Sequence, residues 1–247
     1  MSMISYKQNY QTINLNKATY LIMTQVSELL LQKDGIIFGG FVRDKLIHDH
    51  YATKFYEELK GQSSSYDEVN HHPETKARLL IPKDIDVFIR GTEVETQEVY
   101  SFLESQGFDV QVKIRKRIYG AFKNINQQKV VVKTPKKLGF PVIEVDLDVL
   151  FSTDDQVKPP FNRLDLWCNS LLMDKNGIKV SNQTGSRLDG MGEINKKLFE
   201  LDILKNMFEF KTWPVELLEE PDEKLKNLIE NRIAVMKNRG WKVEEPI

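Results

Sequence analysis

Two aspartates separated by one apolar residue, Asp84 and Asp86, are the side chains of this 247-residue sequence best suited to chemistry. Residues 83–90 alternate between polar and apolar, which predicts a β-strand in which residues i and i+2 face the same side. Both carboxylates would then project together. Two like charges about 4 Å apart repel by roughly 4 kcal/mol at an effective dielectric of 20, so we expect a cation beside them. Mg²⁺ or Mn²⁺ prefers oxygen ligands of this kind.

The same alternation recurs further along the chain, at Glu144, Asp146 and Asp148. If this segment forms a strand beside the first, a third carboxylate joins the pair. Asp146 and Asp148 both suit that position, and spacing neither chooses between them nor excludes Glu144. Such a set of carboxylates can hold two metal ions that activate an attacking hydroxyl and stabilise a leaving pyrophosphate. The alternative is that each acidic row is the solvated face of an edge strand.

A glycine pair, Gly39 and Gly40, lies where a short apolar segment at 35–38 gives way to a helical pattern at 41–48. Glycines let the backbone approach a ligand, and the start of a helix offers N–H groups to an anion. Arg43, one turn into the helix, could add a charge-assisted hydrogen bond to a phosphate oxygen. Considered alone, the glycine pair is equally typical of a plain tight turn.

Together, the Gly39-Gly40-Phe41-Val42-Arg43-Asp44 run and the later Asp84-Ile85-Asp86 resemble the signature of the DNA polymerase β-like nucleotidyltransferase superfamily. Within it, the likeness is to the catalytic head of bacterial-type CCA-adding enzymes and poly(A) polymerases. That family's Arg-Arg-Asp-Phe-Thr-Ile-Asn-Ala-Leu stretch also resembles residues 163–171. Its polar positions match at Arg163, Asp165 and Asn169.

The resemblance implies a metal-binding and catalytic set made of Asp84 and Asp86 with Asp146 or Asp148. It further implies that Gly39, Gly40 and Arg43 contact the triphosphate. The nucleotide site would also be lined by Arg163, Asp165 and Asn169.

The sequence departs from the family pattern in three ways. The 43 residues between Gly40 and Asp84 are several times the usual spacing, and Leu164 replaces an arginine. Only 57 residues follow Gly190, too few for the helical neck, body and tail that hold tRNA. The resemblance therefore extends to the catalytic head and does not extend to CCA addition on tRNA.

The elements that must position these residues alternate irregularly along the chain. Helices are expected at 16–33, 92–106, 193–210 and 222–238, and strands at 35–38, 83–90, 108–115, 129–134 and 142–151. This order favours an α+β fold. The resemblance implies that it is the nucleotidyltransferase fold, a mixed β-sheet flanked by helices. We expect a catalytic domain at 1–190, with an insertion at about 49–82 that contains a helix near 54–60. A helical extension follows at 191–247, and either caps the nucleotide site or covers the sheet.

A basic segment at 113–137 contains nine lysines and arginines and no acid, with Tyr119 and Phe122 interleaved. In a chain whose net charge is −1, this segment could follow an RNA backbone, with the aromatic rings as stacking platforms. The alternative is that its charges face water or balance the acidic cluster across the sheet.

Composition excludes several classes of protein. The single cysteine, Cys168, cannot form an intrachain disulfide or a cysteine zinc cluster. No segment approaches the roughly 18 consecutive apolar residues of a membrane span, and residues 1–11 lack the pattern of a signal peptide. We therefore expect a soluble, cytoplasmic protein without a membrane partner.

The function expected is a metal-dependent nucleotidyltransferase that moves a nucleoside monophosphate from an NTP, such as ATP, to an acceptor hydroxyl. The acceptor could be an RNA 3′ end, a protein side chain or a small molecule. Two alternatives remain open: a non-catalytic nucleotide- or RNA-binding protein with this fold, and a scaffold whose insertion docks a partner.

Overall fold

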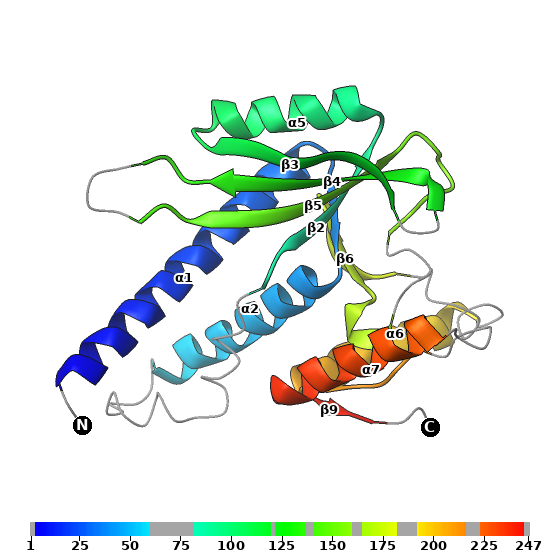
Figure 1. Ribbon diagram of the computed structural model, residues 1–247. Coiled ribbons are helices and arrows are strands. Elements are labelled where there is room, and N and C mark those ends of the chain that lie inside the picture. The colour runs from blue at the N-terminus through cyan, green and yellow to red at the C-terminus, as the bar shows by residue number, and fades with distance from the viewer. Residues whose placement is uncertain are drawn as a thin grey trace.

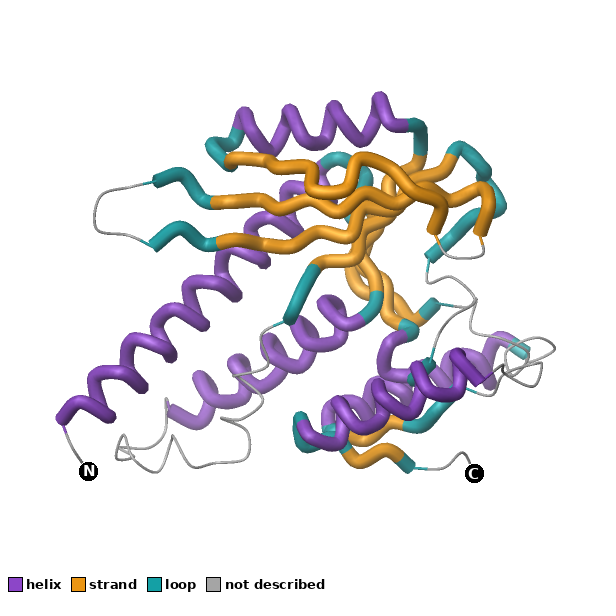
Figure 2. The backbone as a smooth tube through the Cα atoms, viewed as in Figure 1, coloured by secondary structure: helices purple, strands orange, loops and turns teal. Residues whose placement is uncertain are grey.

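The computed structural model describes residues 3–59, 82–119, 122–136, 141–159, 165–181, 192–215 and 223–244. These residues form a seven-stranded mixed β-sheet, five α-helices and a separate pair of short strands (Figures 1 and 2). The expected mixed α and β architecture is confirmed. Among the described helices, none has the length and apolar character needed to span a bilayer.

The large sheet has the strand order β3-β4-β5-β2-β1-β6-β7. Only β2 and β5 pair in parallel, and every other neighbouring pair in this sheet is antiparallel. The two strands that carry the acidic alternations therefore lie side by side. The strands are β1 (Ile36–Phe38), β2 (Ile85–Arg90), β3 (Asp109–Tyr119), β4 (Phe122–Lys133), β5 (Glu144–Ser152), β6 (Leu171–Asp174) and β7 (Gly177–Val180).

One face of the sheet is hydrophobic and is covered by helices. Ile85 and Val87 of β2 and Leu147 and Val149 of β5 are buried and belong to one core cluster with apolar residues of five helices. Because side chains alternate along a strand, burying these residues turns the intervening aspartates to the opposite face. Three of these helices are α1 (Met3–Gln32), α2 (Gly40–Leu59) and α5 (Glu93–Ser105), and the other two belong to the C-terminal segment.

The α5 helix shows how local sequence fixes an element. Thr92 is its N-cap, accepting a hydrogen bond from the Val94 amide, while the Glu95 carboxylate accepts one from the Thr92 amide at 2.7 Å. Such a reciprocal capping box satisfies amides that the first helical turn leaves without partners. The predicted helix at 92–106 is confirmed, as are the strands predicted at 83–90 and 142–151.

Several expectations about elements are wrong, among them the strand expected at 129–134, which begins at Phe122. The first helix begins at Met3 rather than at residue 16, and the helix expected to end at His48 continues to Leu59. The proposed insertion therefore begins inside α2, and the separate helix expected near 54–60 is the end of α2. The β6–β7 hairpin was not expected, because its strands have only four residues each.

Tertiary contacts explain why α2 extends through a polar sequence. The His48 ring stacks on Tyr20 of α1 with ring centroids 3.8 Å apart, and the Tyr20 hydroxyl donates to Asp49 at 2.9 Å. Immediately after Asp49, His50 stacks on Phe208 and the Tyr51 hydroxyl donates to the Phe208 carbonyl. These partners come from helices distant in sequence, so local periodicity does not reveal them.

The C-terminal segment packs into the main core. It contains α6 (Glu193–Phe208), α7 (Glu223–Asn238) and two short parallel strands, β8 (Lys211–Thr212) and β9 (Lys242–Val243). Met207, Met236 and Trp241 are buried in the same cluster as the sheet residues. The chain after α6 also contacts the segment just before β6, where the Trp167 amide donates a hydrogen bond to the Trp213 carbonyl at 3.1 Å. The helices expected at 193–210 and 222–238 are confirmed, but the extension is not wholly helical.

If the C-terminal segment is part of one cooperative core, removing its main anchor should destabilise the whole protein. Trp241 is 3% exposed and packs edge-on against Phe210. We expect Trp241→Ala to lower the free energy of unfolding by about 3–5 kcal/mol, the range for truncating a buried aromatic residue, in a single transition in urea monitored by circular dichroism. Val235→Ala, at a 56% exposed position of α7, should change it by less than about 0.5 kcal/mol. A separate early transition in the Trp241 variant would instead identify the segment as an independent unit.

Candidate functional site

The carboxylates of β2 and β5 converge on the face of the sheet opposite the main core. Asp86 is the direct neighbour of Asp148 in the parallel register, and adjacent strands lie about 4.8 Å apart. Both side chains are partly exposed, whereas the intervening Val87, Leu147 and Val149 are buried. The requirement that two separate acidic segments share one face is therefore met.

The register also distinguishes the three acids of β5. Asp148 faces Asp86 directly, whereas Asp146 is exposed and lies two residues nearer the start of the strand. Glu144 is exposed at the first position of β5, where its carboxylate pairs with Lys133 at 2.6 Å. Of the three residues that spacing left open, Asp148 is best placed to act with Asp86.

The pKa values of the β2 aspartates reflect this crowding. Burial, reinforced by the charges of Asp84 and Asp148, raises the pKa of Asp86 to about 7. Burial also raises the pKa of Asp84, with further contributions from Asp148 and Asp146. Lys129 opposes the shift at both residues. Burial is the largest cause of the shift at both residues, and the charged neighbours act in both directions.

Strand β4 supplies the partners of Asp148. One of its carboxylate oxygens accepts from Lys129 Nζ at 3.0 Å and the other from Gln127 Nε2 at 2.8 Å. Among the described residues, no three histidine, cysteine, aspartate or glutamate side chains are grouped so that they could hold a metal ion. The oxygen donors of Asp84, Asp86 and Asp148 suit Mg²⁺ in type. The conformation described engages Asp148 with β4 and is not a formed metal centre.

The glycine turn lies against the same carboxylates. Gly39 has a φ of +74°, a conformation that favours glycine. A Cβ atom added there would lie 3.5 Å from Asp86 Oδ2. The Gly39 amide donates to the Leu171 carbonyl at 3.0 Å, and α2 begins at the next residue. The first turn of a helix has amides without partners inside the helix. A ligand bound at the amino end of α2 would therefore reach these amides and lie beside the carboxylates.

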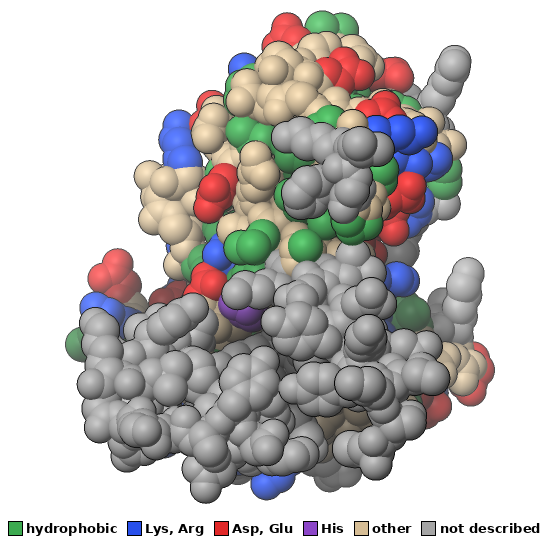
Figure 3. All heavy atoms as spheres, turned by 90° about the vertical axis from the view of Figure 1, so that its left-hand side faces the viewer, with side chains coloured by type: hydrophobic (Ala, Val, Ile, Leu, Met, Phe, Trp, Pro, Cys, Tyr) green, Lys and Arg blue, Asp and Glu red, His purple; other side chains and the backbone are tan. Residues whose placement is uncertain are grey.

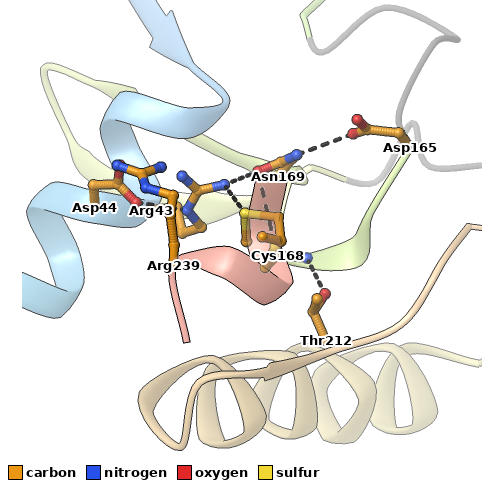
Figure 4. Close-up of polar contacts among 8 residues, drawn as sticks. Arg43, Asp44, Asp165, Cys168, Asn169, Thr212 and Arg239 are labelled. Atoms are coloured by element: carbon orange, nitrogen blue, oxygen red, sulfur yellow. Dashed lines mark hydrogen bonds and ion pairs between the residues drawn. The ribbon is translucent and has the colours of Figure 1, made fainter. Parts of the chain in front are cut away.

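Arg43 lies buried behind the glycine turn. It is 4% exposed, and its Nε donates to Asp44 at 2.7 Å while its Nη1 donates to Asn169 at 2.6 Å (Figure 4). Its guanidinium also lies over the Trp241 ring, 5.5 Å from the centroid. These contacts connect the start of α2 to the C-terminal segment, so in this conformation Arg43 holds protein groups together.

The network continues from Asn169 to α7. Asn169 Nδ2 donates to Asp165 Oδ1 at 2.9 Å, and the other Asp165 oxygen accepts from Arg232 at 2.7 Å. Figure 4 shows Asn169 between Arg43 and Asp165. The Arg232 side chain is 53% exposed, and its charge also acts on Asp86. The structure thus brings Arg43, Asn169 and Asp165 together, whereas Arg163 lies outside the described residues.

Three residues of this network are not among the site residues predicted from the sequence: Asp44, Arg232 and Arg239. Asp44 is buried and accepts from both Arg43 and Arg239, the latter at 3.3 Å. The chain positions of Arg232 and Arg239 give no indication of these pairs, because 67 and 195 residues separate them from their partners. The only signal for Asp44 in the sequence was its position next to Arg43 in the motif.

Part of the basic segment balances the acidic face. Lys129 pairs with Asp148 and Lys133 pairs with Glu144 across the β4–β5 register. Lys113 and Lys136 are exposed, while the side chains at 115–117, 123 and 137 lie outside the described part of the chain. Figure 3 shows Lys or Arg side chains beside Asp or Glu side chains on one face. The alternative of charge balance across the sheet therefore accounts for at least two of the nine cations.

A scan against protein-family models finds no match for this chain, and a search of curated proteins finds no similar sequence.

The raised pKa of Asp86 predicts a pH-dependent stability. The folded state holds the Asp86 proton up to about pH 7, whereas the unfolded state releases it near the ordinary value of 3.8. Asp86 therefore destabilises the fold increasingly as the pH rises from about 4 to 7, and the loss is complete above pH 7. Without added metal, we expect the free energy of unfolding of Asp86→Asn, measured in urea at pH 8, to exceed that of the wild type by on the order of 2 kcal/mol. At pH 5 the difference should be clearly smaller. An equal difference at the two pH values would show that the ionisation of Asp86 does not destabilise the fold.

Proposed function

We propose that the protein is a metal-dependent nucleotidyltransferase, which transfers a nucleoside monophosphate from a nucleoside triphosphate to an acceptor hydroxyl. The observation that carries this proposal is the convergence of Asp86 and Asp148 from two parallel strands against Gly39 at the start of α2. A triphosphate needs cationic neutralisation and hydrogen-bond donors on one side, and a reacting hydroxyl needs a proton acceptor on the other. Carboxylates that could hold the cation and accept the proton lie beside the amides at the start of α2.

Asp84, Asp86 and Asp148 are the residues that would hold Mg²⁺ or Mn²⁺. When bound, the ions neutralise charge on the phosphates and make the acceptor hydroxyl more acidic. Ligation by all three requires the Asp148 side chain to leave Lys129 and Gln127. We expect a change of the Asp148 rotamer to achieve this, because β5 is already paired with β2 in register.

The remaining chemistry assigns a task to each part of the chain. The acceptor oxygen forms a bond to the α-phosphorus as the bond from that phosphorus to the pyrophosphate oxygen breaks. The hydroxyl proton passes to a carboxylate of β5, for which Asp148 is the best placed. The amides at the start of α2 hold the triphosphate, and the Gly39 turn leaves room for it. Positioning and charge neutralisation supply most of the rate in such reactions.

Arg232 extends the proposed nucleotide site to α7. Its side chain is half-exposed, and its charge acts on Asp86 while one nitrogen pairs with Asp165. A guanidinium has further donors free to bind a phosphate or a base in the same plane. We assign the base and sugar side of the site to Asp165, Asn169 and Arg232, and a part of the Lys113 to Lys137 segment to an RNA acceptor.

A second candidate function is non-catalytic binding of a nucleotide or RNA. The observation that favours it is the pairing of Asp148 with Lys129 and Gln127, which leaves no formed metal centre among the described residues. A binding protein would tolerate loss of the carboxylates, whereas a transferase would not.

Transfer of label from a nucleoside triphosphate tests the main proposal. The purified protein is incubated with α-³²P-labelled NTPs, Mn²⁺ or Mg²⁺ and mixed RNA, and the products are separated on a gel. We expect label in the acceptor and release of pyrophosphate. Asp86→Asn should reduce the transfer rate by about a thousandfold or more, since it removes a charge that the reacting centre requires. Asp109→Asn, on the edge strand β3, should retain the wild-type rate. NTP binding without transfer to any acceptor, unchanged in Asp86→Asn, would favour the second candidate.

The role of Arg232 predicts a separate change in kinetics. Arg232→Gln removes a charge that we assign to nucleotide binding, so the KM for NTP should rise about tenfold, the size expected for one charge-assisted hydrogen bond. Lys237→Gln, at an exposed position of the same helix, should leave the KM within about twofold. Thermal melting of both variants separates this effect from unfolding. An unchanged KM in a folded Arg232 variant would restrict this residue to holding Asp165.

A further inference from the structure

A lysine pairs with one of the carboxylates that would hold the divalent cation in the proposed reaction. Lys129 Nζ is 3.0 Å from Asp148 Oδ2, and the two residues are direct partners across the antiparallel strands β4 and β5. Asp148 is in turn the direct partner of Asp86 across β5 and β2. Lys129 on β4, Asp148 on β5 and Asp86 on β2 therefore form one row across three neighbouring strands, with the cation at one end.

The Lys129 charge acts on the carboxylates as a whole. It lowers the pKa of both Asp84 and Asp86, in addition to its direct pair with Asp148. Lys129 thus lies within interaction range of each of the three proposed ligands. Its side chain is 43% exposed and that of Asp148 is 18% exposed, so the pair lies at the boundary with solvent and can open without disturbing the core.

We propose that Lys129 is a resident counter-ion that competes with the divalent cation for Asp148. This inference rests on the proposed function, because it assumes that Asp84, Asp86 and Asp148 bind the metal. While the Lys129 pair is closed, one ligand is withheld and the carboxylate cluster is partly neutralised. When a divalent cation binds, Asp148 turns to it, and the lysine is repelled by the new positive charge and moves outward.

The displaced lysine then has a second task. An ammonium group freed beside a metal centre and facing solvent is suited to pair with a phosphate oxygen of the incoming triphosphate or acceptor. Metal and triphosphate would therefore bind with positive coupling, since each makes the open state of the Lys129 pair more favourable. A centre built in this way binds metal weakly on its own and more tightly with substrate.

The chain offers a matched control on the same strand. Lys133 is also on β4, faces the same side of the sheet and pairs with an acid of β5, Glu144, at 2.6 Å. Glu144 is four residues from Asp148 and exposed, so the Lys133 pair is remote from Asp86. Replacing either lysine by glutamine removes one positive charge from the same face, and only Lys129→Gln removes the charge that pairs with Asp148.

Binding of Mn²⁺ to the full chain without nucleotide tests the inference, with free Mn²⁺ measured by electron paramagnetic resonance. We expect Lys129→Gln to bind Mn²⁺ about fivefold more tightly than the wild type, as the upper range for a half-exposed ion pair allows. Lys133→Gln should remain within about twofold of the wild type. Lys129→Arg, which keeps the charge, should bind Mn²⁺ as weakly as the wild type and guards against a variant that fails to fold. Adding a non-hydrolysable NTP should tighten Mn²⁺ binding more in the wild type than in Lys129→Gln.

Asp86→Asn separates failure of this inference from failure of the proposed function. If Mn²⁺ binding disappears in Asp86→Asn but Lys129→Gln binds no more tightly than Lys133→Gln, the carboxylate centre stands and the counter-ion role of Lys129 is overturned. If Mn²⁺ binding is the same in the wild type and Asp86→Asn, the carboxylates do not form the metal site, and both proposals are overturned.

Discussion

The parallel pairing of β2 with β5 is the constraint on which the rest of the site depends. Burial of Ile85 and Val87 on one strand and of Leu147 and Val149 on the other fixes which way each strand faces. A slip of one residue in either strand would expose its apolar row. The hydrophobic core therefore forces Asp86 and Asp148 onto one face, although their charges repel, and the cost of that repulsion is carried by the folding energy of the sheet.

The groups around the carboxylates can be understood as responses to this imposed charge. Lys129 and Gln127 engage both oxygens of Asp148, and the charge of Arg232 acts on Asp86 from the C-terminal segment. The pKa of Asp86 nevertheless remains raised. Burial is the largest cause of this shift, and the charges of Asp84 and Asp148 add to it. A divalent cation held by the carboxylates would oppose these effects, which is the physical basis for proposing metal chemistry here.

The sequence was sufficient to predict the parts of the site that depend on local pattern. The acidic alternations, the glycine turn and the strands carrying them follow from periods of two and from glycine positions, and the register then selected Asp148 among acids that spacing could not separate. The length of α2 could not be predicted, because His48 and His50 find their partners on α1 and α6. The pairs Arg232–Asp165 and Arg239–Asp44 were equally inaccessible, since tertiary folding alone brings those residues together.

The same long-range pairs give the C-terminal segment a role beyond covering the sheet. Arg43 contacts Asp44 and Asn169 and lies over Trp241, so the helix that begins at the glycine turn is tied to α7 and the residues after it. Buried charges of this kind contribute little net stability but penalise any arrangement that leaves one of them unpaired. Displacing α7 would separate Asp165 from Arg232, and it would leave Asp44 with Arg43 as its one arginine partner among the described residues. The network therefore restricts the position of α7 relative to the carboxylates, which is what a site assembled from both ends of the chain requires.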